Sequence, residues 1–226
     1  MNAIVEGEGD VLLLLHGFLC SKEIFSNQIA FFSKFYKVVA LDFLGYNNQP
    51  MEWDYSLDDY VNFVKSAIFE LGQKEVNILA HSFGCRVAIK LMATTNFVKS
   101  AVLTGSAGLK PKFSLKKFLK IKLFKLAKFL NLKVANKMGS LDYKKLSPIQ
   151  KRSFVKIVNC HLDDLLPKIN ARVLIYHGKF DRETPLYMAK KINEKVKNST
   201  LFIADGGHFA FLENSNQFNY LVKEFL

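Results

Sequence analysis

The segment from residue 76 to residue 92 constrains the fold of this chain more than any other. It begins with an apolar run at 76–79, passes through Ala80-His81-Ser82-Phe83-Gly84, and continues into a stretch typical of a helix. A serine between small residues at a strand-to-helix junction is forced into a tight turn, which exposes its hydroxyl near the free N–H groups of the helix. An ordinary turn serine gives the same pattern, so a nucleophile at Ser82 requires partner residues elsewhere.

Apolar runs of strand length recur on both sides of this unit. We predict strands at residues 11–15, 37–41, 76–80, 98–104, 172–176 and 200–203. Segments with helical spacing separate them, at 22–34, 56–71, 86–92 and 186–196, and another closes the chain at 217–226. Because strands that alternate with helices are joined by right-handed crossovers, the pattern predicts an α/β fold with a doubly wound, mostly parallel sheet.

The alternation breaks between residues 105 and 167, where only helical and lysine-rich sequence occurs. We therefore predict a core made of residues 1–108 and 168–226, with a helical lid at 109–167 inserted in it. An insertion after a strand of such a sheet lies above the carboxyl ends of the strands, where ligands bind in this architecture.

Nearly all of the net charge lies in this insertion. Residues 110–145 hold 12 lysines and one acid, Asp142, so the remainder of the chain contributes only +1 to the total of +12.

Residues 115–130 place large apolar side chains, Phe118 among them, on one helical face opposite lysines. We expect a lid helix over the active-site cleft, with Phe118 as a candidate substrate contact; docking on an anionic membrane surface or on an acidic carrier protein stays open. The lysines lack the arginines and motifs that accompany nucleic-acid binding.

The composition favours a cytoplasmic protein, peripheral at the inner membrane surface if the lid binds lipid. No apolar stretch approaches the ~20 residues of a membrane span, and the first ten residues are acidic where an export signal is basic. The three cysteines, Cys20, Cys85 and Cys160, have no metal-ligand spacing and suit a reducing compartment. We expect no metal and no organic cofactor.

A serine nucleophile needs a base beside it and an acid that orients the base. Asp181 lies just after the predicted strand at 172–176, and His208 lies just after the strand at 200–203. Together with Ser82 they fall at the carboxyl ends of three strands, in the chain order nucleophile, acid, base. Asp42 and Asp205 are weaker candidates for the acid, because Asp42 precedes the nucleophile and Asp205 is too close in sequence to His208.

Acyl transfer also needs hydrogen-bond donors aimed at the developing oxyanion. The N–H of Phe83 directly follows the nucleophile, and the N–H of Phe18, in the loop after the first strand, is the second candidate. We expect His16 to brace that loop and His81 to line the substrate pocket.

These segments resemble the α/β-hydrolase superfamily, and in particular its lidded esterases, lipases and thioesterases. The resemblance covers nearly all of the chain outside the lid and rests on His16-Gly17-Phe18, residues 80–84, residues 178–185 and Gly207-His208. The chain departs from the family pattern in its short amino end, in Ala80 where glycine is usual, and in the loop at 43–46. A serine at position 82 weighs against the dehalogenase branch, which would require aspartate there.

The resemblance and the residues together predict a serine hydrolase that cleaves an ester or thioester with an apolar acyl group through Ser82, His208 and Asp181. Three alternatives stay open: a C–C bond hydrolase or a cofactor-free peroxidase with the same three residues, and a non-catalytic module that binds membrane or protein on the same scaffold.

Overall fold

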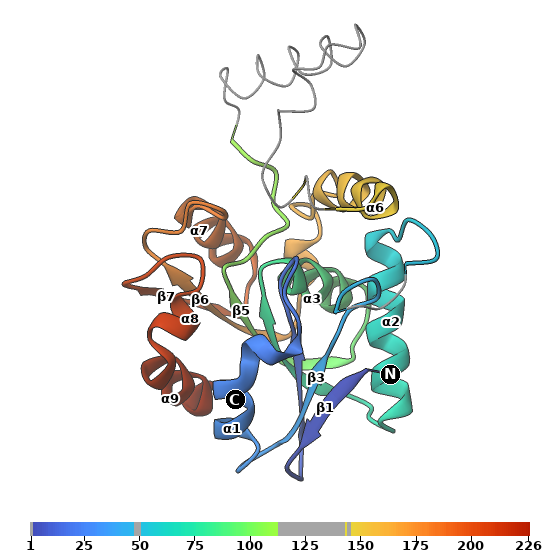
Figure 1. Cartoon of the computed structure of the whole chain (residues 1–226). Coiled ribbons are helices and arrows are strands. Elements are labelled where there is room, and N and C mark those ends of the chain that lie inside the picture. Colours follow the sequence, from blue (N-terminus) through green and yellow to red (C-terminus); the bar gives the residue numbers. More distant parts are fainter. Residues whose placement is uncertain (1, 48–50, 113–142, 144–145) are drawn as a thin grey trace, which may run out of the picture.

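The fold is described by a computed structural model that covers residues 2–47, 51–112, 143 and 146–226 (Figure 1). Within these residues one sheet of seven strands forms, in the order β1-β3-β2-β4-β5-β6-β7. The strands are β1 (Ala3–Glu6), β2 (Val11–Leu15), β3 (Lys37–Leu41), β4 (Val76–His81), β5 (Val98–Thr104), β6 (Arg172–Gly178) and β7 (Ser199–Ala204).

All neighbouring strands are parallel except β1, which pairs with β3 in the antiparallel sense. The sequence pattern gives no sign of β1, because an edge strand of four residues that is exposed at Val5 and Glu6 lacks a continuous apolar run. The six strands that follow it lie where the pattern predicts them, so the predicted mostly parallel sheet is confirmed.

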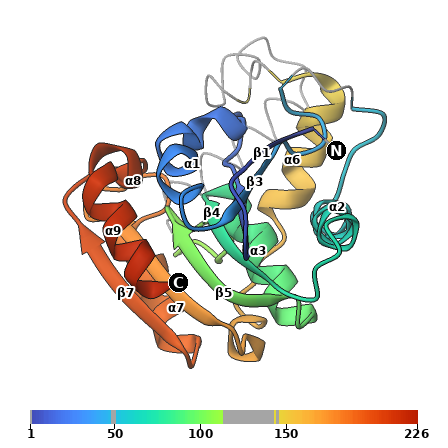
Figure 2. The same ribbon diagram turned by 90° about the horizontal axis from the view of Figure 1, so that it is seen from below.

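Helices cover both faces of the sheet. One face packs against α2 (Leu57–Glu70), α3 (Phe83–Thr94) and α7 (Leu186–Lys195), and the other packs against α1 (Ser26–Phe32), α8 (Ala210–Glu213) and α9 (Ser215–Phe225). Figure 2 shows α1 and α9 on one side of the sheet and α2 and α3 on the other. Short 3-10 helices occur at Lys22–Phe25 (η1) and Leu166–Lys168 (η3).

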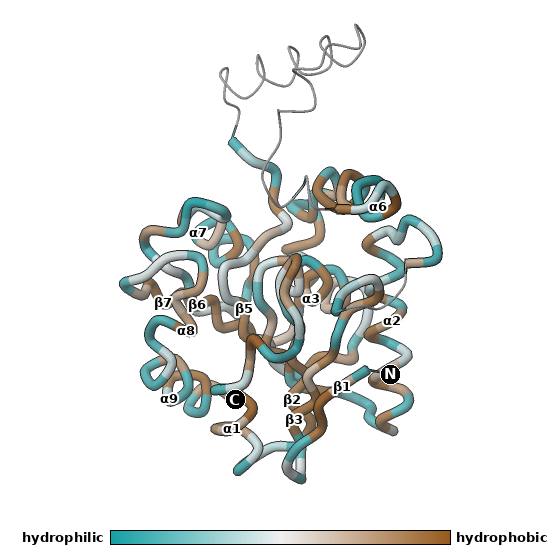
Figure 3. The backbone as a smooth tube through the Cα atoms, viewed as in Figure 1, coloured by the Kyte–Doolittle hydropathy of each residue, from teal (hydrophilic) through white to brown (hydrophobic). Residues whose placement is uncertain are grey.

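The central strands β2 and β4 are mostly hydrophobic because both of their faces are buried. All five residues of β2 and all six of β4 are buried, and hydrophobic residues accordingly concentrate along the central strands in Figure 3. Helix α2 begins as its sequence predicts, since Ser56 and Asp59 form a reciprocal capping box. No helix among the described residues is both long and apolar enough to cross a membrane.

The inserted segment is described only in part. Residues 113–142, 144 and 145 lie outside the described residues, and the candidate substrate contact Phe118 is among them. Helix α6 (Pro148–Val158) belongs to the predicted lid and lies above the carboxyl ends of the sheet in Figure 1. The lid boundaries of 109 and 167 therefore stay a prediction.

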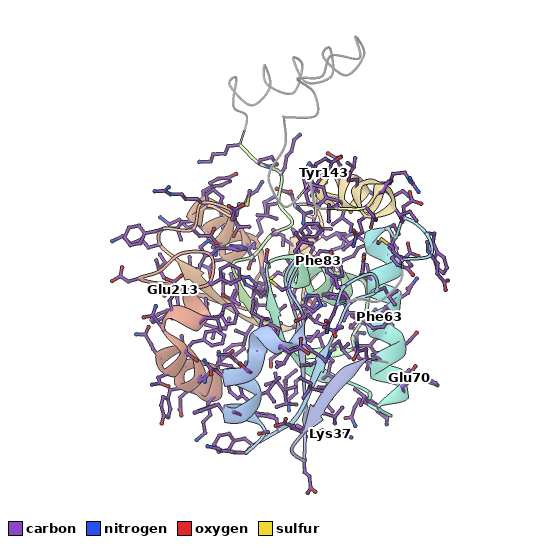
Figure 4. All side chains as sticks on the ribbon, viewed as in Figure 1. Lys37, Phe63, Glu70, Phe83, Tyr143 and Glu213 are labelled. Atoms are coloured by element: carbon purple, nitrogen blue, oxygen red, sulfur yellow. The ribbon has the colours of Figure 1, made fainter. Side chains whose placement is uncertain are left out.

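The turn between β4 and α3 brings two backbones into direct contact. A Cβ atom on Gly84 would lie 2.1 Å from the carbonyl oxygen of Leu15 in β2, and the Gly84 N–H donates to the carbonyl of His16 over 3.0 Å. Figure 4 shows Phe83 at this end of the sheet, with Lys37 and Glu70 at the other. Only glycine allows the first turn of α3 to sit this close to β2.

We expect Gly84→Ala to lower the free energy of unfolding by about 2–3 kcal/mol, because the added methyl group must push α3 away from β2. Gly72→Ala is the control without a steric clash. Unlike Gly84, Gly72 has a positive φ of 67°, and no atom lies within 4 Å of its added Cβ. Its cost is about 1 kcal/mol from backbone strain alone. Equal losses in urea denaturation would contradict the steric explanation.

Candidate active site

The three residues predicted to act together are brought together by the ends of three strands. Ser82 follows β4, Asp181 follows β6 and His208 follows β7, so all three lie at the carboxyl edge of the sheet. The Oγ of Ser82 is 3.0 Å from Nε2 of His208, and Nδ1 of His208 is 2.8 Å from Oδ2 of Asp181. These contacts form one continuous chain of hydrogen bonds from hydroxyl to carboxylate.

Ser82 occupies a backbone conformation that few residues other than glycine adopt. Its φ of 51° and ψ of −105° lie outside the regions favoured by L-residues, and the strain turns the chain sharply from strand to helix. The N–H of Ser82 donates to the carbonyl of Thr104 over 3.0 Å, which ties the turn to β5. The side chain is thereby held at the tip of the turn, partly exposed.

Asp181 is buried, and both of its carboxylate oxygens accept hydrogen bonds. The N–H groups of Glu183 and Thr184 donate to Oδ1 over 2.9 Å each, and the Thr184 hydroxyl donates to Oδ2 over 2.7 Å. Burial alone would raise the pKa of Asp181, but the hydrogen bonds from His208 and Thr184 outweigh it and hold the pKa at about 2. The carboxylate is therefore ionised at neutral pH and accepts a hydrogen bond from Nδ1–H of His208, which leaves Nε2 free to accept a hydrogen bond from Ser82.

The ring of His208 is confined by close neighbours. An added Cβ on Gly105, whose φ is +55°, would lie 3.0 Å from that ring. On another side the His81 ring lies 4.8 Å away between centroids, and the Phe209 ring lies 5.3 Å away. The imidazole can thus keep one orientation between Ser82 and Asp181.

The two predicted oxyanion donors are the N–H groups of Phe18 and Phe83. Among the described residues, neither the N–H of Phe18 nor that of Phe83 has a hydrogen-bond acceptor. Both residues line the same cavity as Ser82. Their role as oxyanion donors stays a prediction.

His16 braces the loop that carries Phe18. Its Nε2 accepts a hydrogen bond from the N–H of Phe43 over 3.1 Å, and its Nδ1 lies 2.7 Å from the carbonyl of Gly17. His16 is fully buried, and burial lowers its pKa, so the ring is neutral in this role. These contacts agree with the bracing role that the sequence analysis expects for His16.

Asp42, the first alternative acid, has other partners. It accepts from the backbone N–H of Lys22 over 2.8 Å, forms an ion pair with the ammonium group of Lys22, and accepts from Asn47 over 2.8 Å. Burial would raise the pKa of Asp42, but the bonds from Lys22 and Asn47 outweigh it and lower that pKa. Asp42 therefore anchors the loops beside the site and does not orient His208.

His81, the predicted pocket residue, is fully buried although it borders the cavity. Its Nδ1 lies 3.2 Å from the carbonyl of Thr104, and its ring packs on Phe209 and Phe211 as well as on His208. Burial and the nearby His208 lower the pKa of His81 to about 3, so it is neutral at pH 7. Its contact with substrate stays a prediction, while its contact with His208 is direct.

A cavity of about 490 Å³ opens beside the Ser82 hydroxyl. Its size falls within the range of small-molecule sites. Its lining is largely apolar and aromatic, and Arg86 and Glu183 are the charged residues outside the histidines. The lining consists of Gly17, Phe18, Cys20, His81, Ser82, Phe83, Arg86, Ala107, Phe154, Ile157, Val158, Glu183, Thr184, His208 and Phe209.

Within the described part of the chain no group of three or more His, Cys, Asp or Glu side chains is arranged to hold a metal ion.

The comparison with known families agrees with this geometry. Residues 10–137, more than half of the chain, match the family model described as alpha/beta hydrolase fold. The chain belongs to the α/β-hydrolase family.

Two relatives that align over nearly the full length are named as hydrolases. The α/β hydrolase is 26% identical to the AB hydrolase superfamily protein YisY of Bacillus subtilis (strain 168), over 97% of this chain and 92% of that protein. It is also 26% identical to a 2-hydroxymuconate semialdehyde hydrolase of Pseudomonas putida, over 98% of this chain and 88% of the relative. The solved structure of an esterase from Exiguobacterium antarcticum has the same fold, with a TM-score of 0.79 at 21% identity, covering 98% and 93% of the two chains.

The sequence analysis does not identify some residues of this α/β hydrolase site. Thr184 supports Asp181, Lys22 holds Asp42, and Phe154 and Arg86 line the cavity. Only Thr184 had a local signal, since it lies three residues after the acid in a turn. The others meet the site across long sequence separations that no periodicity encodes.

We expect Asp181 to contribute a pH-dependent share of stability. Its folded pKa of about 2 lies below the unfolded value of about 3.8, so the contribution is present above pH 4 and is lost as the pH falls toward 2. Between pH 5 and pH 3 the wild type should lose about 1 kcal/mol more unfolding free energy than Asp181→Asn. Denaturation curves at both pH values measure this difference, and parallel losses in the two proteins would refute it.

Proposed function

We propose that this chain is a serine hydrolase that cleaves an ester or thioester with an apolar acyl group. The observation that carries the proposal is the unbroken chain of hydrogen bonds from Ser82 through His208 to Asp181. Ser82 and His208 also line a largely apolar cavity. Hydroxyl, imidazole and carboxylate in this order form the constellation that activates serine in acyl transfer.

In the acylation step the Ser82 oxygen bonds to the carbonyl carbon of the substrate while its proton moves to Nε2 of His208. The N–H groups of Phe18 and Phe83 donate to the resulting oxyanion, and each such donor is worth about 3 kcal/mol in the transition state. The carbon–oxygen or carbon–sulfur bond to the leaving group then breaks, and His208 returns the proton to the departing atom.

In the deacylation step water replaces the leaving group. Nε2 of His208 takes a proton from the water as its oxygen bonds to the acyl carbon, and then gives the proton back to Ser82 as the acid product leaves. Asp181 stays ionised throughout, because its pKa of about 2 is far below neutrality, and it stabilises the transient imidazolium.

The apolar acyl preference is supported by the described walls of the cavity. Phe18, Phe154, Ile157, Val158 and Phe209 surround the space beside Ser82. These side chains offer no hydrogen bonds, so an apolar chain gains free energy there by leaving water.

C–C bond hydrolysis is the second candidate, and one specific observation favours it. The relative from Pseudomonas putida is named as a 2-hydroxymuconate semialdehyde hydrolase and aligns with 98% of this chain. The same serine, histidine and aspartate would serve that reaction, so substrate screening has to include 2-hydroxymuconate semialdehyde as well as esters.

We expect a fluorophosphonate probe to label the wild type and to leave Ser82→Ala unlabelled, because only an activated serine attacks the phosphorus. Ester hydrolysis should fall at least ~10⁴-fold in the same variant. Ser106→Ala is the matched control, since Ser106 is a buried serine just after β5 with no role in the chain of hydrogen bonds.

Failure to label the wild type would contradict catalysis and favour the non-catalytic binding module. Labelling that persists in Ser82→Ala would assign the nucleophile to another residue.

We expect kcat/KM to rise with acyl length from acetyl to about octanoyl p-nitrophenyl esters, by a few-fold to tenfold for each added pair of methylenes, because each methylene that enters the cavity is removed from water. Initial-rate kinetics across the series measure the trend. A preference for acetyl or for charged acyl groups would overturn the apolar assignment.

A further inference from the structure

Helix α6 forms one wall of the cavity but is weakly anchored by apolar contacts. Phe154, Ile157 and Val158 face the cavity, and Ile157 is the only hydrophobic residue of α6 that is fully enclosed. A helix with so small a buried face depends on other contacts to hold its position.

Hydrogen bonds to distant parts of the chain supply those contacts. The Ser153 hydroxyl donates to the carbonyl of Tyr55 over 2.7 Å, and the Gln150 side chain donates to the carbonyl of Gly45 over 3.3 Å. The Phe154 ring also packs on the Phe18 ring at 4.9 Å between centroids. These contacts hold the first and middle turns of α6 beside the loop after β3 and the loop after β2.

The last turn of α6 is held by Arg86. Nη1 of this side chain donates to the carbonyl of Ile157 over 3.1 Å and to the carbonyl of Cys160 over 3.0 Å. The Ile157 carbonyl also accepts from the N–H of Cys160 over 3.1 Å. Because carbonyls at a helix C-terminus carry partial negative charge, the guanidinium group adds a charged donor that stabilises this end of α6 and the residues just after it. Among the described residues Arg86 forms no ion pair with a carboxylate, and the helix end therefore takes the place of a counter-ion.

Arg86 reaches α6 from the helix that begins at the nucleophile. It lies four residues after Ser82, one turn into α3, and it borders the same cavity. The Arg86 side chain thus connects α3, which begins directly after Ser82, with α6, which forms part of the cavity wall.

We propose that Arg86 is a specificity-determining residue, which fixes the last turn of α6 against α3 and so sets the length of unbranched aliphatic acyl chain that the cavity accepts. The inference rests on the proposed hydrolase function and deepens it. Arg86 acts through the position of Ile157 and Val158, so it is a positioning residue and takes no part in the chemistry.

The first experiment compares acyl-length profiles of the wild type, Arg86→Met, Arg86→Lys and Arg152→Met on p-nitrophenyl esters from butyryl to dodecanoyl. Loss of both hydrogen bonds frees the wall, so in Arg86→Met the ratio of kcat/KM for dodecanoyl to that for butyryl should rise at least about tenfold, mainly through KM. Arg86→Lys keeps a donor and should fall between the two. Arg152→Met should match the wild type, because that exposed guanidinium lies on α6 and pairs with Asp54 at the surface.

A uniform loss on all esters in both Arg86 variants, or an unchanged ratio, would overturn the proposal. So would a selective loss on half-esters that carry a free carboxylate, since that result would make Arg86 a direct contact of an anionic substrate.

The second experiment needs no substrate. Amide hydrogen exchange at residues 154–160 should be about tenfold faster in Arg86→Met than in the wild type and unchanged in Arg152→Met, because two hydrogen bonds that hold this turn are lost. Unchanged exchange would overturn the role of Arg86 even if ester hydrolysis is observed. Faster exchange in a protein inert toward every ester would refute the proposed function and leave the structural role of Arg86 standing.

Discussion

The strained turn at Ser82 is the constraint on which the rest of the structure depends. A non-glycine residue at positive φ costs free energy, and it persists only where its surroundings enforce it. Here the carbonyl of Thr104, at the end of β5, accepts a hydrogen bond from the N–H of Ser82. The carbonyl of His16, just after β2, accepts from the N–H of Gly84, and the absence of a side chain at Gly84 lets α3 pack directly on β2. The parallel register of these strands therefore fixes where the hydroxyl points, and the ends of β6 and β7 bring Asp181 and His208 to meet it.

Much of this arrangement could be predicted from the sequence. Strands buried on both faces read as continuous apolar runs, and parallel strands share one carboxyl edge, so residues that follow separate runs are expected to meet. The juxtaposition of Ser82, Asp181 and His208 follows from that rule together with their chain order. The capping box at Ser56 and Asp59 was predictable for a different reason, because both partners lie within one turn of the same helix.

No local sequence pattern predicts strand β1 or the contacts of Lys22 and Arg86. Strand β1 is short and half-exposed, so it has no apolar run to reveal it. Lys22 looks like a surface lysine in sequence, yet it meets the buried Asp42 from 20 positions away. Arg86 looks like an exposed position of α3 and instead binds carbonyls more than 70 residues along the chain. Contacts of this kind depend on how finished elements pack, which the spacing of apolar residues does not specify.

The carbonyl of Thr104 accepts from the N–H of Ser82, lies beside Nδ1 of His81, and contacts the thiol of Cys85. The chain leaves the sheet directly after this residue, through Gly105 beneath the His208 ring, and only then enters the inserted segment. The turn at Ser82 is thus tied to β5 before the chain enters the inserted segment. A different insertion beyond Gly105 would replace part of the cavity wall, and with it the fit to substrate, while the hydrogen bonds of the Thr104 carbonyl stay in place.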